Sequence, residues 1–428
     1  MSPSNSVLRI RSDDPTAQIK VLDASANIVA QGLRSLEAPL ANGLYKIRVR
    51  VGSSSQERLV ALDDQLPEQT FPRLEFASPI PIDGTERSHE YHQDAIKWAW
   101  DHPAPARGAG SRLLVCAREW SPGGTRGHPN PAASLSIVLP SGERIPFASV
   151  AHVRSQGDAI AVGVFDVNPG FYSIEVELPD GSRLRRAMHA SPGWATQLYM
   201  LFHGVGDQRV PNLADGSAVI AKSPVVHDEE TRLAEIALDA LTQHRAILSD
   251  QMRGLLSGKF SQPLLGLVGA HLLLRDGVSD LVHKVVKNLV RMLGADHPDV
   301  VAIKTKVDKT VPGAVTEPPM LRASWDFLVE ASGTVPQLIP PTTPAGQMAE
   351  SVVPAGAWLV WQPAGQGGSK LEVLRAYLRA QSRDSFASDD ASPSFDAAPA
   401  DLGEAARADL AIALGLPRPA LDGLLARL

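Results

Sequence analysis

The sequence lacks the residue types and segments on which several classes of protein depend. Cys116 is its one cysteine among 428 residues, which excludes an intrachain disulfide framework and cysteine-rich zinc sites. No apolar run reaches the roughly 20 residues of a membrane-spanning helix, and the first residues show no signal-peptide pattern. The net charge of −6 gives no reason to expect nucleic acid or a membrane as a partner. We therefore expect a cytoplasmic protein of roughly two to four domains.

The motifs of common enzyme families are also absent. The sequence has no G-x-x-x-x-G-K-[ST] phosphate-binding loop, and the glycine-rich segment 364–370 fails its spacing. It has no G-x-S-x-G string, the motif in which α/β-hydrolases carry their nucleophilic serine. We predict no catalytic residue, no metal site and no bound cofactor.

One segment nevertheless resembles a hydrolase element. Residues 198–209 read LYMLFHGVGDQR, a strand that ends in His-Gly as in the oxyanion loop of α/β-hydrolases. Because no nucleophile follows, the favoured interpretation is a last sheet strand and then a glycine hinge. A hydrolase that uses His203 and the 204–209 glycine loop is the alternative function.

Two further side chains invite a catalytic interpretation. Cys116 could serve as a peptidase nucleophile, but it lies in the alternating strand RLLVCARE without a peptidase signature, so we expect a buried strand residue. His271 lies inside an apolar helical segment and could act as an acid or base. A hydrogen-bonded core histidine is the commoner arrangement and the one that we predict.

Two further groups of residues could bind a ligand. His89, Glu90 and His92, together with His102, could coordinate a metal, since two histidines three residues apart share one helical face. A clear third and fourth ligand is lacking, so a solvated linker is favoured. Four tryptophans could form a ligand-stacking surface, although ordinary packing explains them better. These are Trp98, Trp100, Trp358 and Trp361.

The first half of the chain predicts short antiparallel strands. From Tyr45 to Val51 apolar residues alternate with basic ones, which indicates a strand with one buried face. The pattern has a second copy, because ANGLYKIRVRV at 41–51 aligns without gaps with NPGFYSIEVEL at 168–178. We infer two related small β-sandwiches in tandem.

This repeated strand resembles the PEGA and carboxypeptidase-regulatory-like β-sandwich modules. In those modules a proline-glycine or asparagine-glycine turn leads into a Gly-x-Tyr strand. The resemblance implies a structural or binding module and no catalytic residues.

The second half of the chain predicts helices. From about residue 226 apolar residues recur at spacings of three and four, and the connections are short. The most continuously apolar stretch, 258–277, predicts a helix that is buried on all sides. Four strings carry a further resemblance: PGWATQLYML (192–201), GKFSQPLLGLVGAHLLL (258–274), ADHPDVVAI (295–303) and PPMLRASWDFLV (318–329). On these, residues 190–330 resemble uncharacterised bacterial proteins loosely associated with caspase-like peptidase modules of conflict systems. That resemblance implies an accessory or scaffold role.

These patterns divide the chain into a series of segments. In chain order we expect a first β-sandwich (1–65), a proline-rich linker with a short helix (66–111), a second β-sandwich (112–203), a hinge loop (204–225), an α-helical domain (226–383), a disordered tether (384–401) and a C-terminal helix pair (402–428). The predicted fold class is multidomain β plus α: two small antiparallel β-sandwiches in tandem, then an α-helical bundle and a tethered C-terminal helix pair.

The favoured function is a non-enzymatic scaffold or accessory protein that binds other proteins. The resemblance of residues 190–330 implies a peptidase of a bacterial defence or signalling system as one such partner. Binding would use exposed sheet faces, the helical surface or the tail. A further alternative makes the protein the regulated substrate of a partner peptidase that cuts the C-terminal tail.

Overall fold

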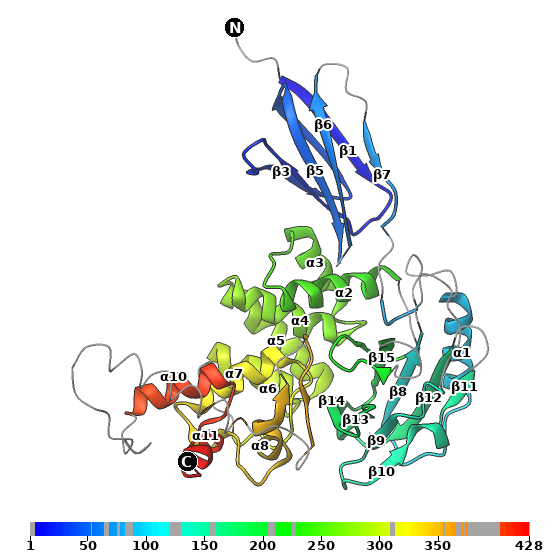
Figure 1. The fold of residues 1–428 in the computed structure, drawn as a ribbon, viewed down its shortest axis with the longest axis vertical. Coiled ribbons are helices and arrows are strands. Elements are labelled where there is room, and N and C mark those ends of the chain that lie inside the picture. Colours follow the sequence, from blue (N-terminus) through cyan, green and yellow to red (C-terminus); the bar gives the residue numbers. More distant parts are fainter. Residues whose placement is uncertain are drawn as a thin grey trace.

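A computed structural model gives the fold of this chain. It describes residues 5–52, 54–63, 68–74, 78–81, 89–119, 130–154, 159–203, 210–224, 228–308, 313–353, 356–363, 370, 374 and 403–427. The protein is mixed β plus α, and most of its helices lie in the C-terminal half of the chain (Figure 1).

The first strands build one sheet, which we call the N-terminal module (residues 5–71). The strand order is β6-β5-β2-β3-β4-β1-β7. The bounds are β1 Asn5–Ser12, β2 Gln18–Leu22, β3 Ile28–Leu33, β4 Ser35–Ala41, β5 Gly43–Val51, β6 Ser54–Leu62 and β7 Gln69–Phe71. Ile47, Val49 and Val51 are buried, so the alternation predicted for this strand is confirmed.

Further strands form two more sheets, in the orders β10-β9-β13-β14-β19-β18 and β11-β12-β8-β15-β16, with β17 paired to β15. The bounds are β8 Ser111–Arg118, β9 Leu135–Val138, β10 Arg144–Pro146, β11 His152–Arg154, β12 Ile160–Val167, β13 Gly170–Glu177, β14 Arg183–Ala190, β15 Ala195–His203, β16 Val210–Pro211, β17 Ser217–Ala221, β18 Val352–Val353 and β19 Val360–Trp361. Buried side chains of both sheets share one core, and this core continues into the helices.

The two copies of the repeated strand make the same local contact. The Tyr45 hydroxyl donates to the Ala41 carbonyl oxygen over 2.8 Å, and the Tyr172 hydroxyl donates to the Asn168 carbonyl oxygen over 3.0 Å. These residues are equivalent in the alignment of 41–51 with 168–178. Each copy is also followed by an antiparallel partner, β6 after β5 and β14 after β13.

The sheets differ from the expected ones in two respects. The expectation of purely antiparallel sheets is wrong, because β1 pairs with β7 and β8 pairs with β15 in parallel. Some strands also lie in segments for which the sequence predicted a loop or helices. The expected hinge 204–225 contains β16 and β17, and β19 from the expected helical segment pairs with β14. Strands this short carry too few residues for an alternation to appear.

The helices are α1 His89–Asp101, α2 Asp228–Thr242, α3 Ser249–Gly258, α4 Pro263–Arg275, α5 Ser279–Leu293, α6 Pro298–Asp308, α7 Arg322–Ser332, α8 Pro344–Met348, α10 Glu404–Leu414 and α11 Arg418–Leu425. Short 3₁₀ turns are η1 Phe147–Ser149, η3 Pro336–Leu338 and η4 Ala349–Ser351. The short helix expected in the linker is confirmed as α1. In the described ranges, none of the helices combines the length and apolar character needed to cross a membrane.

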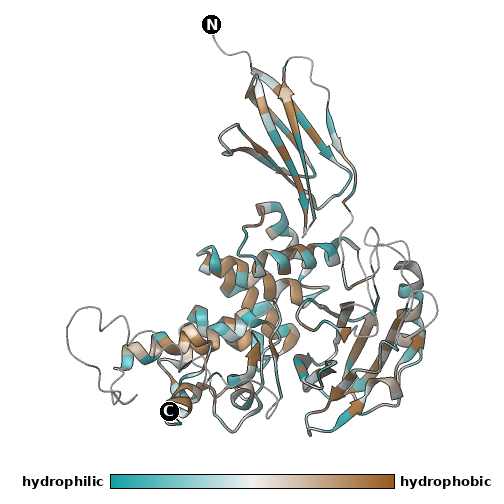
Figure 2. Ribbon diagram, in the orientation of Figure 1, coloured by the Kyte–Doolittle hydropathy of each residue, from teal (hydrophilic) through white to brown (hydrophobic). Residues whose placement is uncertain are grey.

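Helix α4 is the buried helix that the apolar stretch predicts. Its residues from Pro263 to Leu273 are all buried, and neighbouring helices α2, α3 and α5 surround it. A Cβ added at Gly266 would lie 3.0 Å from a Leu289 side-chain atom, so α5 approaches closely at this glycine. Figure 2 shows hydrophobic residues concentrated in these central helices.

The N-terminal module projects from the helices and contacts them at its base (Figure 1). There the Asp14 carboxylate forms an ion pair with the Arg232 guanidinium on α2, and both residues are buried. On α3, the Gln251 side-chain amide donates to the Thr16 carbonyl oxygen over 3.3 Å. These contacts fix the module to the body while its far end and outer faces stay in solvent.

Candidate functional site

The cysteine that could serve as a nucleophile is inert. Cys116 lies on β8, is fully buried and belongs to a hydrophobic core, as its strand pattern predicts. Burial raises the pKa of its thiol well above the ordinary value. Because the thiolate is the reactive form, this environment opposes nucleophilic chemistry.

His271 is the hydrogen-bonded core histidine that the sequence predicts. It lies on α4, and its Nε2 atom is 2.9 Å from the Ser324 hydroxyl oxygen on α7. Burial lowers the pKa of its imidazole to about 3, so the ring is neutral at physiological pH. A base this weak is poorly suited to abstract a proton near pH 7.

The histidines proposed as metal ligands have other partners. His92 is buried, and its Nδ1 atom lies 3.2 Å from an Arg118 guanidinium nitrogen. His102 is exposed and stacks on the Trp98 ring, with 4.5 Å between centroids. The side chains of residues 89 and 90 lie outside the described residues. Within the described ranges, no three or more His, Cys, Asp or Glu side chains gather closely enough to hold a metal ion.

The tryptophans have separate local partners. Trp98 also contacts the His152 ring, with 4.3 Å between centroids. The Arg112 guanidinium lies 4.6 Å above the Trp100 ring, and the Arg186 guanidinium lies 3.8 Å above the Trp358 ring. Trp361 is buried and lies 6.4 Å from the Phe171 ring. Packing therefore accounts for Trp358 and Trp361, whereas Trp98 stays 44% exposed beside the two histidine rings.

The hydrolase alternative rests on residues that the structure does not describe. His203 is the last residue of β15, but its side chain and residues 204–209 lie outside the described residues. The geometry therefore adds no support for a nucleophile or an oxyanion site there.

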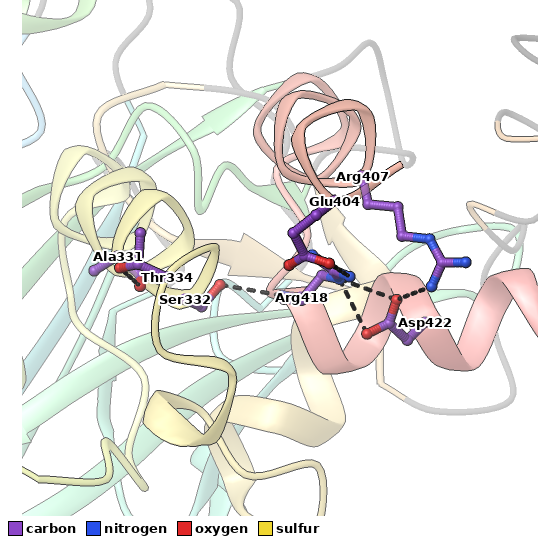
Figure 3. Close-up of polar contacts among 7 residues, drawn as sticks. All are labelled: Ala331, Ser332, Thr334, Glu404, Arg407, Arg418 and Asp422. Carbon is purple, nitrogen blue, oxygen red and sulfur yellow. Dashed lines mark hydrogen bonds and ion pairs between the residues drawn. The ribbon is translucent and has the colours of Figure 1, made fainter. Parts of the chain in front are cut away.

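The C-terminal helix pair packs on its own chain (Figure 3). The backbone N–H of Arg418 donates to the Ser332 hydroxyl over 3.1 Å at the end of α7. The Arg418 guanidinium donates to the Glu404 carboxylate on α10 over 2.6 and 2.8 Å, and to Asp422 one turn along α11 over 3.0 Å. Arg418 is buried, so these bonds lock α10, α11 and α7 together.

Apolar packing and further polar contacts support the same docking. The Trp325 indole N–H donates to the Gly415 carbonyl oxygen over 3.3 Å, and Lys370 donates to the Leu414 carbonyl oxygen over 2.7 Å. A small core of leucines fills the pair. The face of the C-terminal helix pair that contacts α7 is thus occupied by its own chain. The expected tether 384–401 lies outside the described residues.

The outer face of β5 and β6 presents two exposed large apolar side chains. Leu44 is 57% exposed and Leu59 is 65% exposed. The strand register places Leu59 opposite Lys46 and Leu44 opposite Ala61, so all four side chains share one face. We call this face the β5–β6 patch.

Basic side chains lie within the patch and on its β2 side. Arg48 lies on the same face as Lys46, and the register of β2 with β5 adds Lys20 beside it. Glu57 forms ion pairs with Lys46 over 3.2 Å and with Arg48 at the short limit of a hydrogen bond. Three cations against one carboxylate leave an excess of positive charge on the β5 and β2 side of the two exposed leucines, while β6 forms the edge of the sheet.

The strand sequences contain a pattern that could have indicated this patch, although the overall composition does not show it. In an alternating strand the outward positions are normally polar. Leu44 and Leu59 occupy outward positions of GLYKIRVRV and SSQERLVAL, where they break the pattern. What the sequence could not show is that the two leucines lie diagonally opposite each other.

Comparison with known proteins adds no family to this description. No protein-family model and no curated protein matches the chain. The function is therefore inferred from the surfaces and side chains described above.

Proposed function

We propose that the protein is a non-enzymatic accessory or scaffold protein that binds another protein through the β5–β6 patch. The observation that carries the proposal is the pair of leucines, each more than half exposed, on a module whose described contacts with the helices lie at its base. Adjacent exposed apolar side chains within a polar rim are typical of interaction surfaces.

The charge of the patch indicates what kind of partner surface would bind it. With Lys20, Lys46 and Arg48 against Glu57, the patch fits a partner surface that carries acidic side chains beside an apolar centre. Binding should therefore weaken as salt is added, because exposed charges are screened. A peptidase of a bacterial defence system is the partner that the sequence resemblance suggests.

We also propose that the two β regions are tandem sandwiches of one type, related to the PEGA and carboxypeptidase-regulatory-like modules. The equivalent hydrogen bonds of Tyr45 and Tyr172 support a common origin. Such a hydrogen bond from a tyrosine hydroxyl to a backbone carbonyl is a recurrent device of β-sandwich folds. The helical segment would then be the body that presents the first module.

Replacing both leucines of the patch tests the binding proposal. For the double variant Leu44→Ser, Leu59→Ser we expect loss of the partner with a change of less than about 0.5 kcal/mol in the free energy of unfolding, because exposed substitutions alter stability little. The matched control is Ile28→Ser, Val29→Ser, which removes two exposed apolar residues from β3 of the same module.

The measurement is recovery with the tagged full chain from its native cells, followed by direct binding with the purified partner. We expect the wild type and the β3 control to bind equally and the patch variant to bind at least about tenfold more weakly. Equal binding by both double variants, or no bound protein at all, would contradict the proposal.

A further inference from the structure

A cavity of about 560 Å³ lies apart from the β5–β6 patch. It opens between β14, the connection from α5 to α6, and residues 313–317 ahead of α7. Its polar lining consists of His189, His297, Glu317, Asp296 and Thr316. A volume of this size lies in the range of small-molecule sites, about 300–1,000 Å³.

Two histidine rings and a carboxylate converge in this cavity. The rings of His189 and His297 lie 4.6 Å apart between centroids. His189 Nε2 lies 3.1 Å from a Glu317 carboxylate oxygen, so this nitrogen carries the proton and donates. The Nδ1 atom of His189 has no hydrogen-bond partner among the described residues.

His297 is the feature that points to a ligand. It is 1% exposed and lines the cavity, yet neither ring nitrogen has a hydrogen-bond partner among the described residues. The nearest acidic oxygen belongs to Asp299 and lies 3.8 Å from Nδ1, too far for a hydrogen bond. A buried polar group without a partner costs about 1–3 kcal/mol, which a bound ligand would recover.

His297 offers an acceptor because its ring is neutral. Burial, and secondarily the neighbouring His189, lowers the pKa of the His297 imidazole well below its ordinary value. A neutral imidazole has one N–H donor and one nitrogen lone pair. A ligand with an N–H group can therefore donate to this ring.

The charges around the cavity select a cation. Among the described residues, the lining contains two carboxylates, Glu317 and Asp296, and no lysine or arginine. The opposing influence is the start of α6 at Pro298, whose dipole is equivalent to about half a positive charge. Even with His189 protonated, the two full negative charges outweigh these positive contributions.

We propose that this cavity binds a small organic ammonium ion, with Glu317 as counter-ion and His297 as hydrogen-bond acceptor. The ammonium group would lie between these two side chains. Leu293, Val301 and Val315 supply apolar wall for the rest of the molecule. The ligand is therefore an amine attached to a short apolar group.

The test uses phenethylammonium as the probe and isothermal titration calorimetry on the full chain. We expect saturable binding at millimolar concentration or below, and no binding of phenylacetate, which has a similar ring and the opposite charge. Glu317→Gln should weaken phenethylammonium binding about tenfold, since a charge-assisted hydrogen bond is lost. Asp296→Asn, at the exposed rim, should weaken it about two- to threefold.

The matched control is Glu37→Gln, the same substitution at an exposed site on the N-terminal module, which should leave binding unchanged. Thermal unfolding of each variant shows whether it is folded, and His297→Asn gives a second, independent loss of binding. The proposal is overturned if phenylacetate binds as tightly as the amine, if Glu317→Gln binds like wild type, or if the amine does not bind at all.

Discussion

Replacement of Asp14 by alanine is expected to lower the free energy of unfolding by about 3–5 kcal/mol. Asp14 is fully buried, and its partner Arg232 is 1% exposed. Without this carboxylate the guanidinium keeps its charge in a site that water does not reach, which is the costly case for a buried ion pair. Asp14 also accepts hydrogen bonds from the Thr16 backbone N–H over 2.9 Å and from its hydroxyl over 2.7 Å.

Chemical denaturation with two comparison variants checks this expectation. Glu37→Ala removes a carboxylate that is exposed and 3.6 Å from Arg9, so it should cost less than about 1 kcal/mol. The double variant Asp14→Leu, Arg232→Met removes both charges and should recover much of the loss. A single Asp14→Ala variant as stable as the Glu37→Ala control would show that the ion pair does not anchor the module.

The second large effect is a change in pH dependence when His271 is replaced by glutamine. The folded pKa of His271 is about 3, below its ordinary value of 6.5, because burial disfavours the charged ring. Its stabilising contribution is therefore complete above pH 6.5 and is lost as the pH falls towards 3. Between pH 6.5 and 4 the free energy of unfolding of the wild type should fall by about 3 kcal/mol more than that of His271→Gln.

Glu235 on α2 should show the opposite slope. Its carboxyl lies near Arg118 and Arg186, but burial dominates and raises its pKa from 4.5 to about 7. A raised folded pKa gives stability that is complete below pH 4.5 and is lost as the pH rises through 7. Because the side chain is partly solvent-accessible, we expect Glu235→Gln to remove only about 2 kcal/mol of this dependence.

Denaturant unfolding at a series of pH values separates the two groups. The difference between wild type and His271→Gln should grow on acidification, and the difference between wild type and Glu235→Gln should grow on alkalinisation. Parallel stability curves for wild type and His271→Gln from pH 6.5 to 4 would contradict a buried neutral imidazole at this position.

Local patterns predicted the elements that are long and periodic. The alternation of residues 45–51 identified β5, and the apolar stretch identified α4, which is buried on all sides. Both follow from a pattern that is complete within one segment of the chain: an alternation in β5 and a continuous apolar run in α4. The repeated Gly-x-Tyr strand likewise pointed to an equivalence that the hydrogen bonds of Tyr45 and Tyr172 support.

Features that depend on distant segments could not be read from the sequence. Asp14 and Arg232 are 218 residues apart, and neither lies in a distinctive pattern. The cavity takes His189, His297 and Glu317 from a strand, a helix connection and a loop. The two-residue strand β19 exists because β14 offers it a free edge, and its own sequence, Val-Trp, is too short to show a period.

Site-specific photo-cross-linking tests the binding claim most directly. The photo-reactive residue p-benzoylphenylalanine would replace Leu59 in the full chain, and in a second protein it would replace Leu281, which is 40% exposed on α5. If a partner binds the β5–β6 patch, irradiation should cross-link position 59 to a separate protein, and added salt should reduce the yield. Position 281 should give no such product. Irradiation at position 59 that yields only uncross-linked chain, or the same products as position 281, would contradict it.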